Sequence, residues 1–228
     1  MRILALGAHP DDIEIFMFGA LALWKQSGAG LHFAIATDGA KGGTTNPKTL
    51  ARKRRTEAIA AAALLDVEPV FLDFPDGALV ADAALIAAIK KLIADTGADL
   101  VITHAPNDYH GDHRALSDAA RIASSFSVPV LHADTLGGTA FAPSHYVDIS
   151  KVIDIKADAI RKHVSQNPER FVTSMSAQNA FRAGQCNAPE NSFAEAYRFE
   201  PVFPFADIRD LLPPAPKVRP VSRPDVKR

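Results

Sequence analysis

Two short polar stretches carry the residue types that bind metal ions and move protons. One is His9-Pro10-Asp11-Asp12, and the other, about a hundred residues later, is His110-Gly111-Asp112-His113. Each stretch offers two candidate metal ligands three residues apart. A catalytic zinc ion takes three nitrogen or carboxylate ligands from the protein and keeps one position open for water. Together the two stretches predict a metal site, which neither would indicate alone.

The polar groups that do not bind the metal would be free to transfer protons. His9 and Asp12 can reach one point across their turn, and either His110 or His113 can supply the third ligand. If the third ligand is His113, Asp11 and His110 remain as an acid–base pair. Zinc lowers the pKa of its bound water to about 7, and a carboxylate within reach can pass that proton to a leaving amine. This chemistry is the hydrolysis of an amide or an ester.

Such a site needs strands that deliver both turns to one edge of a sheet. Residues 2–8 are apolar and predict a buried strand, with a helix over 13–27 after the first turn. Residues 99–103 predict another strand, and a helix over 113–124 follows the second stretch. Ligands of open α/β sheets bind at the carboxyl ends of the strands. We therefore expect the two turns to converge.

The rest of the chain continues this alternation of strands and helices. Further strands are predicted over 31–37, 69–74, 128–132 and 193–200, with a short extended piece at 146–149. Further helices are predicted over 48–65, 81–96 and 167–187, and one more begins at Asp148 or Ser150 and ends near His163. The pattern favours an α/β fold, a Rossmann-like, mostly parallel sheet with helices on both faces.

Length and composition indicate one soluble globular unit. The 228 residues, of which 47% are apolar, can bury a sizeable core. We expect a single domain over 1–212, followed by a proline-rich, basic tail over 213–228 that is extended or disordered. The single cysteine, Cys186, excludes an intrachain disulfide and fits a reducing cytoplasm.

Charge and hydropathy exclude several classes of partner. The net charge of −1 indicates no nucleic-acid footprint and no membrane-surface patch. The first apolar run is too short for a signal peptide, and no stretch reaches the roughly 20 apolar residues of a membrane span. We therefore expect a cytoplasmic protein that binds neither nucleic acid nor membrane.

Other polar residues have simpler interpretations. Asp38 and Asp76 follow strands and are most simply turn residues. The basic run over 52–55 is typical of a solvated helix face. Asp112 could orient one histidine, because metal-binding imidazoles usually donate their second N–H to a carboxylate. Of the four histidines outside the two stretches, namely His104, His132, His145 and His163, only His163 lies in a polar context that suits a neighbour of the site.

The chain resembles the LmbE-like, or PIG-L-type, deacetylases. The resemblance is carried by 8–14, 37–39, Arg54 with Glu57, 75–77 and 107–113, and more weakly by Lys156, His163, 165–166, Arg182 and 194–197. It covers residues 1 to about 200, and its two metal motifs are specific as a pair. Members often carry glycines where this chain has Phe16 and Phe18, which are otherwise most simply core residues.

The resemblance implies a hydrolase that removes the N-acetyl group from an amino sugar. The implied metal is Zn²⁺, and Fe²⁺ can share the same ligand types. The implied ligands are His9, Asp12 and His113. The implied catalytic residues are Asp11 as general base, His110 as the charge-stabilising acid, and Asp112 as the neighbour or orienter of His110. A small amino-sugar substrate and assembly into a homo-oligomer are also implied, and members acting on N-acetylglucosamine joined to a small acid, as in bacillithiol synthesis, look most similar.

Two alternative functions stay open. The first keeps the metal chemistry but acts on a thiol-conjugate amide or another N-acyl amine. The second is a nucleotide-binding or regulatory module without hydrolysis, suggested by the glycine-rich loop over 38–46. That loop lacks the spacing and the following lysine of a phosphate-binding loop.

Overall fold

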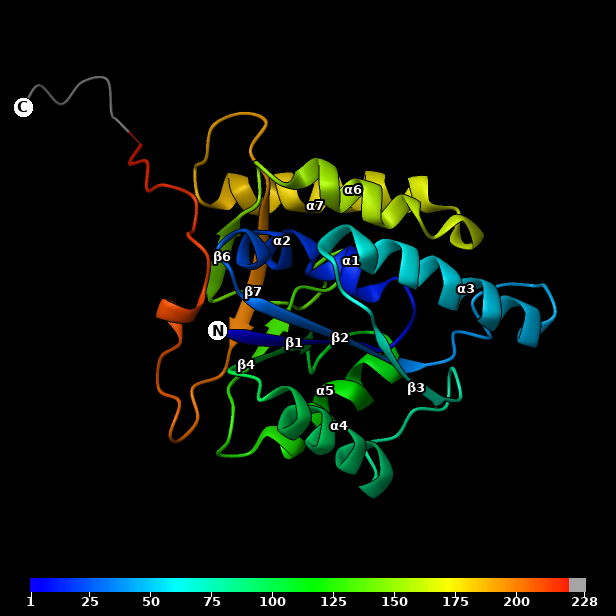
Figure 1. Ribbon diagram of the computed structural model, residues 1–228. Helices are drawn as coiled ribbons and strands as arrows, with labels where there is room; N and C mark the ends of the chain where they lie inside the picture. Colours follow the sequence, from blue (N-terminus) through cyan, green and yellow to red (C-terminus); the bar gives the residue numbers. More distant parts are fainter. Residues whose placement is uncertain (222–228) are drawn as a thin grey trace, which may run out of the picture.

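A single mostly parallel sheet positions the two polar stretches. The computed structural model describes residues 1–221, and within them seven strands pair in the order β3-β2-β1-β4-β5-β7-β6 (Figure 1). The strands are β1 (Arg2–Gly7), β2 (Gly30–Thr37), β3 (Val70–Phe74), β4 (Leu100–His104), β5 (Val130–Ala133), β6 (His145–Asp148) and β7 (Ala194–Phe199). The first five are parallel, whereas β7 runs antiparallel to both β5 and β6.

Helices cover both faces of this sheet. They are α1 (Asp12–Phe16), α2 (Phe18–Gln26), α3 (Pro47–Ala62), α4 (Ala83–Thr96), α5 (Gly111–Ser124), α6 (Ile153–Arg161) and α7 (Pro168–Gln185), with short 3₁₀ turns at Ala63–Leu65, Val164–Gln166 and Arg209–Leu211. Helices α4 and α5 lie on one face and the other five on the opposite face (Figure 1). The predicted α/β fold, Rossmann-like with helices on both faces, is confirmed.

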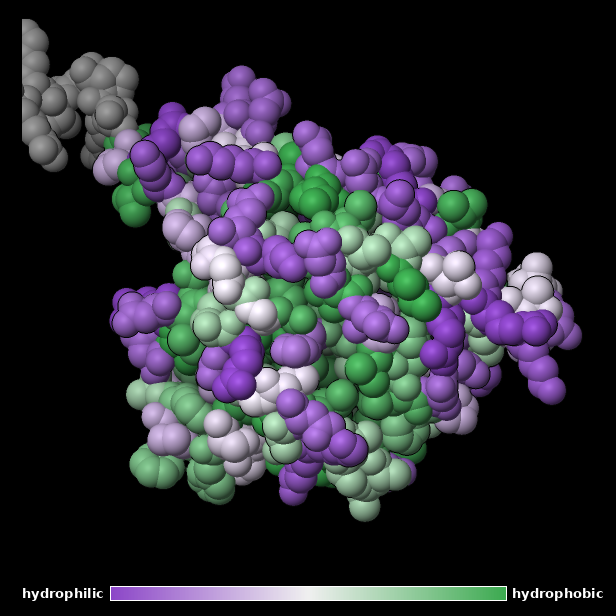
Figure 2. All heavy atoms as spheres, viewed as in Figure 1, coloured by the Kyte–Doolittle hydropathy of each residue, from purple (hydrophilic) through white to green (hydrophobic). Residues whose placement is uncertain are grey.

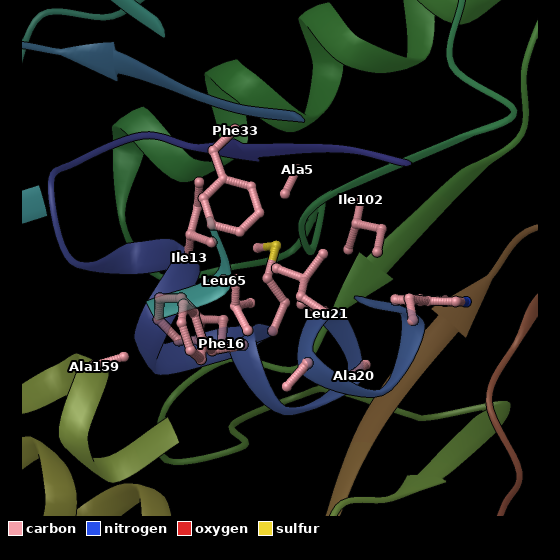
Figure 3. Packing of buried hydrophobic residues seen from close by; sticks show 14 of the residues in the cluster. Ala5, Ile13, Phe16, Ala20, Leu21, Phe33, Leu65, Ile102 and Ala159 are labelled. Atoms are coloured by element: carbon pink, nitrogen blue, oxygen red, sulfur yellow. The ribbon is translucent and has the colours of Figure 1, made fainter. Parts of the chain in front are cut away.

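The apolar run of β1 is explained by burial on both faces. Ile3 and Ala5 belong to the core cluster under α1, α2 and α6, while Leu4 and Leu6 belong to the cluster under α4 and α5. Successive side chains of a strand point to opposite faces, so a strand covered on both sides is apolar throughout. Figure 3 shows the first cluster, where helix residues such as Phe16 and Leu21 pack beneath Ala5 and Phe33.

The predicted helix over 13–27 is wrong in one respect, because it is two helices. It breaks at Met17, whose φ of −141° and ψ of 2° are not helical. The first backbone N–H groups of α2 are held by a distant side chain: Gly19 and Ala20 each donate to the Glu195 carboxylate at 2.8 Å. A Cβ at Gly19 would lie 2.9 Å from Glu195 Oε1, so this approach requires glycine. A carboxylate at a helix N-terminus is also favoured by the helix dipole.

One other prediction about an element end needs correction. Helix α6 begins at Ile153 without a side-chain cap, because Asp148 instead accepts hydrogen bonds from the backbone and hydroxyl of Ser150. The tail over 213–221 has no helix or strand, and it contacts β6, where Asp148 N donates to Pro214 O at 2.9 Å. The part of the tail prediction that covers 222–228 falls outside the described residues.

None of the helices in residues 1–221 has the length and apolar character needed to cross a bilayer. Hydrophilic side chains gather over α3, at the right of the view in Figure 2. This is the helix that carries the basic run over 52–55.

The Glu195 carboxylate yields a stability prediction. It accepts hydrogen bonds from Lys156 Nζ at 2.6 Å and Tyr197 Oη at 2.6 Å, and all three residues are buried. Lys156→Met leaves this buried charge without its cationic partner, so we expect a loss of about 3 kcal/mol in the free energy of unfolding, measured by urea denaturation. Lys91→Met, which removes the exposed pair with Asp95, should change it by less than about 0.5 kcal/mol. Equal effects of the two substitutions would refute this role for Lys156.

Candidate active site

The first polar stretch forms a strained turn between β1 and α1. Asp11 has a φ of 137°, a region that disfavours residues with a side chain and costs of order 1–3 kcal/mol. Arg54 holds the turn in place: its Nη2 donates to Pro10 O at 2.8 Å and to Asp11 Oδ1 at 3.0 Å, and its Nη1 donates to Gly39 O at 3.0 Å. Strain of this kind, over-determined by a buried arginine, is typical of functional turns.

The burial of Arg54 corrects the interpretation of the basic run. Arg54 is only 3% exposed, whereas Arg52 and Lys53 face solvent as predicted. The basic run has the same composition whichever of its four residues faces the interior of the protein. The sequence alone therefore does not show that Arg54 is the buried one.

The second polar stretch forms the start of α5. Asp108 Oδ1 accepts a hydrogen bond from His110 N at 2.8 Å, and His110 Nδ1 accepts one from Asp112 N at 3.2 Å. Strands β1 and β4 are parallel neighbours, so their carboxyl ends open side by side. This adjacency explains how turns about a hundred residues apart in sequence meet in space.

The structure brings His9, Asp12 and His113 together. His9 Nδ1 lies 3.2 Å from Asp12 Oδ2, His113 Nε2 lies 3.4 Å from the same oxygen, and the two ring nitrogens are 3.3 Å apart. Ligand atoms placed 2.0–2.1 Å from a tetrahedral zinc ion are separated by about 3.3–3.4 Å. The triangle therefore has the dimensions of one face of a zinc coordination sphere, and its donors are of the types that zinc and ferrous iron accept.

The electrostatics of this cluster also suit a cation. Burial opposes protonation of His9, but the charge of Asp12 and the nearby carboxylates outweigh it and raise the pKa of His9 to about 12. The pKa of His113 is raised to about 9 against its burial, chiefly by Asp12. Burial raises the pKa of Asp12, but the neighbouring histidines hold it well below its ordinary value. The carboxylates thus stabilise positive charge at this point, and either protons on the imidazoles or a metal ion can supply that charge.

Carboxylates on the far side of the two imidazoles fix their orientation. His9 Nε2 lies 3.1 Å from Asp112 Oδ2 and 3.3 Å from Asp76 Oδ1, and His113 Nδ1 lies 3.1 Å from Asp108 Oδ2. Such partners set the tautomer and raise the basicity of a metal-binding imidazole. The Asp112 side chain therefore lies against His9, while its backbone N–H donates to His110 Nδ1.

Sequence reasoning missed three members of the cluster. Asp76 is not merely a turn residue, because its carboxylate lies beside His9 and accepts a hydrogen bond from Lys41 N at 2.8 Å. Asp108, two residues before His110, belongs to the cluster because its Oδ2 lies 3.1 Å from His113 Nδ1. His104 ends β4, stacks on His113 at 3.8 Å between ring centroids, and approaches Asp12 Oδ2 to 3.1 Å. Its place at the end of the strand next to β1 was the available signal.

These additional residues make other ligand sets conceivable. Within residues 1–221, three other sets also bring their ligand atoms within 4.8 Å of one another: His9, His110 and His113; Asp12, His104 and His113; and His9, Asp76 and Asp112. The triangle of His9, Asp12 and His113 is compact, with every edge between 3.2 and 3.4 Å.

Asp11 and His110 lie beside the triangle at the wall of an open cleft of about 490 Å³. The ring of His110 is 4.6 Å from that of His9 between centroids. Burial raises the pKa of Asp11 even though Arg54 opposes the shift, and burial together with the charge of His9 lowers the pKa of His110. The shift of Asp11 brings its carboxyl closer to neutral pH, as suits a general base, and the shift of His110 leaves its ring neutral, with one N–H able to donate a hydrogen bond.

The residues near position 163 approach the site indirectly. His163 is buried behind the cleft with its Nε2 3.2 Å from Glu14 Oε2. The Glu57 carboxylate accepts from the backbone and hydroxyl of Ser165 at 2.9 and 2.6 Å. Gln166, and not His163, therefore lines the cleft.

Solved structures with this fold include proteins of different activity. The N,N'-diacetylchitobiose deacetylase from Pyrococcus horikoshii superposes with a TM-score of 0.79 at 23% identity, covering 92% of this chain and 88% of that one. The 4-carboxy-2-hydroxymuconate hydratase from Pseudomonas putida superposes with a TM-score of 0.77 at 22% identity, covering 88% and 97%. At these identities the likeness shows a shared fold, and a fold alone does not assign a reaction.

Comparison of the amino-acid sequence with known proteins identifies relatives of this chain. Diacetylchitobiose deacetylase from Thermococcus kodakarensis is 28% identical over 189 residues, which are 74% of this chain and 71% of that protein. A probable N-acetyl-alpha-D-glucosaminyl L-malate deacetylase 2 from Bacillus subtilis is 26% identical over 192 residues, covering 72% and 83%. The model of the PIG-L family, described as GlcNAc-PI de-N-acetylase, matches residues 4–124. That match spans more than half of the 228 residues and contains both polar stretches, so the chain belongs to the PIG-L family.

Proposed function

We propose that this chain is a metal-dependent hydrolase that removes the N-acetyl group from an N-acetylglucosamine-type amino sugar or its conjugate. The observation that carries the proposal is the triangle of ligand atoms from His9, Asp12 and His113, with Asp11 and His110 beside it in an open cleft. Membership of the PIG-L family and the activities printed for its relatives support the same reaction.

The three ligands would hold Zn²⁺ or Fe²⁺. A divalent cation there would polarise the amide carbonyl and acidify water. The two imidazoles would bind it through His9 Nδ1 and His113 Nε2, because their other nitrogens already face Asp112 and Asp108. That division fixes which nitrogen of each ring carries the proton.

Asp11 would act as the general base. It takes a proton from the attacking water and returns it to the nitrogen of the departing amino sugar. Its backbone is fixed by the strained turn and its Oδ1 by Arg54, which leaves Oδ2 for the reaction. Its raised pKa makes it a better proton acceptor than an exposed aspartate.

His110 would stabilise the negative charge that develops on the carbonyl oxygen by donating a hydrogen bond from its ring. Its ring lies at the wall of the cleft, where solvent and substrate can reach it. Its Nδ1 already accepts from Asp112 N, so Nε2–H is the group available to donate. A donor aimed at an oxyanion is worth about a hundredfold or more in turnover.

Cytoplasmic location, assembly into a homo-oligomer and a single domain over 1–212 stay predictions. The geometry of the site depends on none of them.

Substitution of the acid and the base should separate turnover from metal binding. We expect Asp11→Asn and His110→Ala each to lower acetate release from N-acetylglucosamine derivatives by at least about a hundredfold, while elemental analysis shows unchanged metal content. Asp118→Asn, an exposed aspartate of α5, is the control and should remain active. Near-normal turnover in either active-site variant would refute its assigned role, and nucleotide binding by a metal-free protein would favour the regulatory alternative.

The orientation of His113 gives a second test. Asp108→Asn replaces the carboxylate that faces His113 Nδ1, so we expect zinc affinity to fall about 10–100-fold, measured by competition with a chelator. His113→Ala should lose the metal altogether. Full zinc content in His113→Ala would remove that residue from the ligand set, and unchanged affinity in Asp108→Asn would show that its carboxylate does not support the ligand.

A further inference from the structure

A second hollow opens beside the cleft, and the two share part of their lining. Tyr109 and Leu136 line the cleft that holds the ligand triangle and also line a neighbouring groove of about 680 Å³. These two side chains therefore border both hollows. A molecule whose reacting group sits beside His113 can extend over Tyr109 into the groove.

Helix α7 forms one wall of this groove. The wall residues recur at every third or fourth position and therefore share one face of the helix; they are Ser174, Ala177, Gln178, Phe181 and Gln185. At 1.5 Å per residue this face is about 16 Å long. The groove can thus hold a portion of substrate well beyond the reacting amide.

The loop between β5 and β6 forms the opposite wall, and two of its residues in that wall are glycines, which have no side chain to fill the groove. Gly137 and Gly138 both have positive φ, 88° and 62°, and a Cβ at Gly138 would lie 3.1 Å from Arg182 Nη2. The Gln178 side chain anchors the loop, since its Oε1 accepts from Gly137 N at 2.7 Å and its Nε2 donates to Thr135 O at 2.7 Å. These hydrogen bonds therefore hold the loop against α7, and the two walls of the groove are fixed relative to each other.

Two exposed aromatic rings stand along this path. Tyr109 is 64% exposed and Phe181 is 60% exposed. Exposed apolar surface that is gathered in a groove is one sign of a binding site, and both rings line the same groove. A flat aromatic face suits the apolar C–H face of a sugar ring, which it covers without demanding hydrogen bonds.

The charge of the groove favours an uncharged ligand. Its one charged wall residue, Arg182, donates from Nε to Asp134 Oδ2 at 2.6 Å and is neutralised there. Gln178 and Gln185 contribute neutral amides. The cations Lys41 and Arg170 line the cleft but not the groove, so an acidic group would be held elsewhere.

We propose that this groove binds the part of the substrate beyond the acetylated ring, and that this part is an uncharged sugar. The chain would then prefer an N-acetylglucosamine disaccharide or longer oligosaccharide to the monosaccharide. This inference rests on the proposed deacetylase function and adds the class of substrate.

The test compares kcat/KM for N-acetylglucosamine, N,N'-diacetylchitobiose and N-acetylglucosamine linked to malate. We expect the disaccharide to be the best of the three. Phe181→Ala should raise KM for the disaccharide and lower the disaccharide-to-monosaccharide ratio of kcat/KM about tenfold, the effect of one lost aromatic contact. Ala177→Trp, which fills the groove from an exposed helix position, should lower that ratio further. The matched control is Phe126→Ala, an exposed phenylalanine that lines neither hollow.

The outcomes separate this inference from the proposed function. If the sugars are deacetylated but Phe181→Ala and Ala177→Trp leave the ratio unchanged, the groove assignment is overturned and the proposed function stands. A preference for the malate conjugate that survives both substitutions likewise overturns it. If no acetylated sugar releases acetate, the proposed function itself fails and the groove assignment falls with it.

Discussion

One buried carboxylate, that of Asp12, is the point on which the site depends. Four nitrogens converge on its Oδ2: His9 N at 2.6 Å, His104 Nε2 at 3.1 Å, His9 Nδ1 at 3.2 Å and His113 Nε2 at 3.4 Å. A buried charge is costly unless neighbouring groups compensate it. The sheet order satisfies this need, because β1 and β4 are adjacent and parallel and so bring three imidazoles to the same oxygen.

The surrounding structure holds this convergence in place at some cost. Asp11 keeps a disfavoured backbone conformation because Arg54 binds it, Pro10 O and Gly39 O at once. Glu195 on β7 joins the N-terminus of α2 to Lys156 on α6 through hydrogen bonds to both. Buried ion pairs of this kind are weak evidence for stability. Here they hold the N-terminus of α2, the helix that follows α1, against β7 and α6.

The fold and the chemistry are separate properties of this protein. A hydratase and a deacetylase share its architecture, so the sheet supplies a ligand-binding edge without choosing the reaction. The reaction is determined by the side chains at the strand ends and by the residues that line the cleft and groove above them. In this chain the lining of the cleft includes Lys41 and Arg170, and the lining of the neighbouring groove includes the aromatic side chains of Tyr109 and Phe181.

The sequence by itself determined the alternation of strands and helices, the edge at which ligands bind and the two polar stretches of the site. These features are local, because period, apolar runs and turn residues are visible within a short window. Only the tertiary structure decided that Arg54 turns inward, that Asp76 and His104 join the cluster and that α1 and α2 are separate helices. Each of these depends on a partner distant in sequence, such as Glu195 for the helix break. Contacts between elements arise from packing, which no local pattern records.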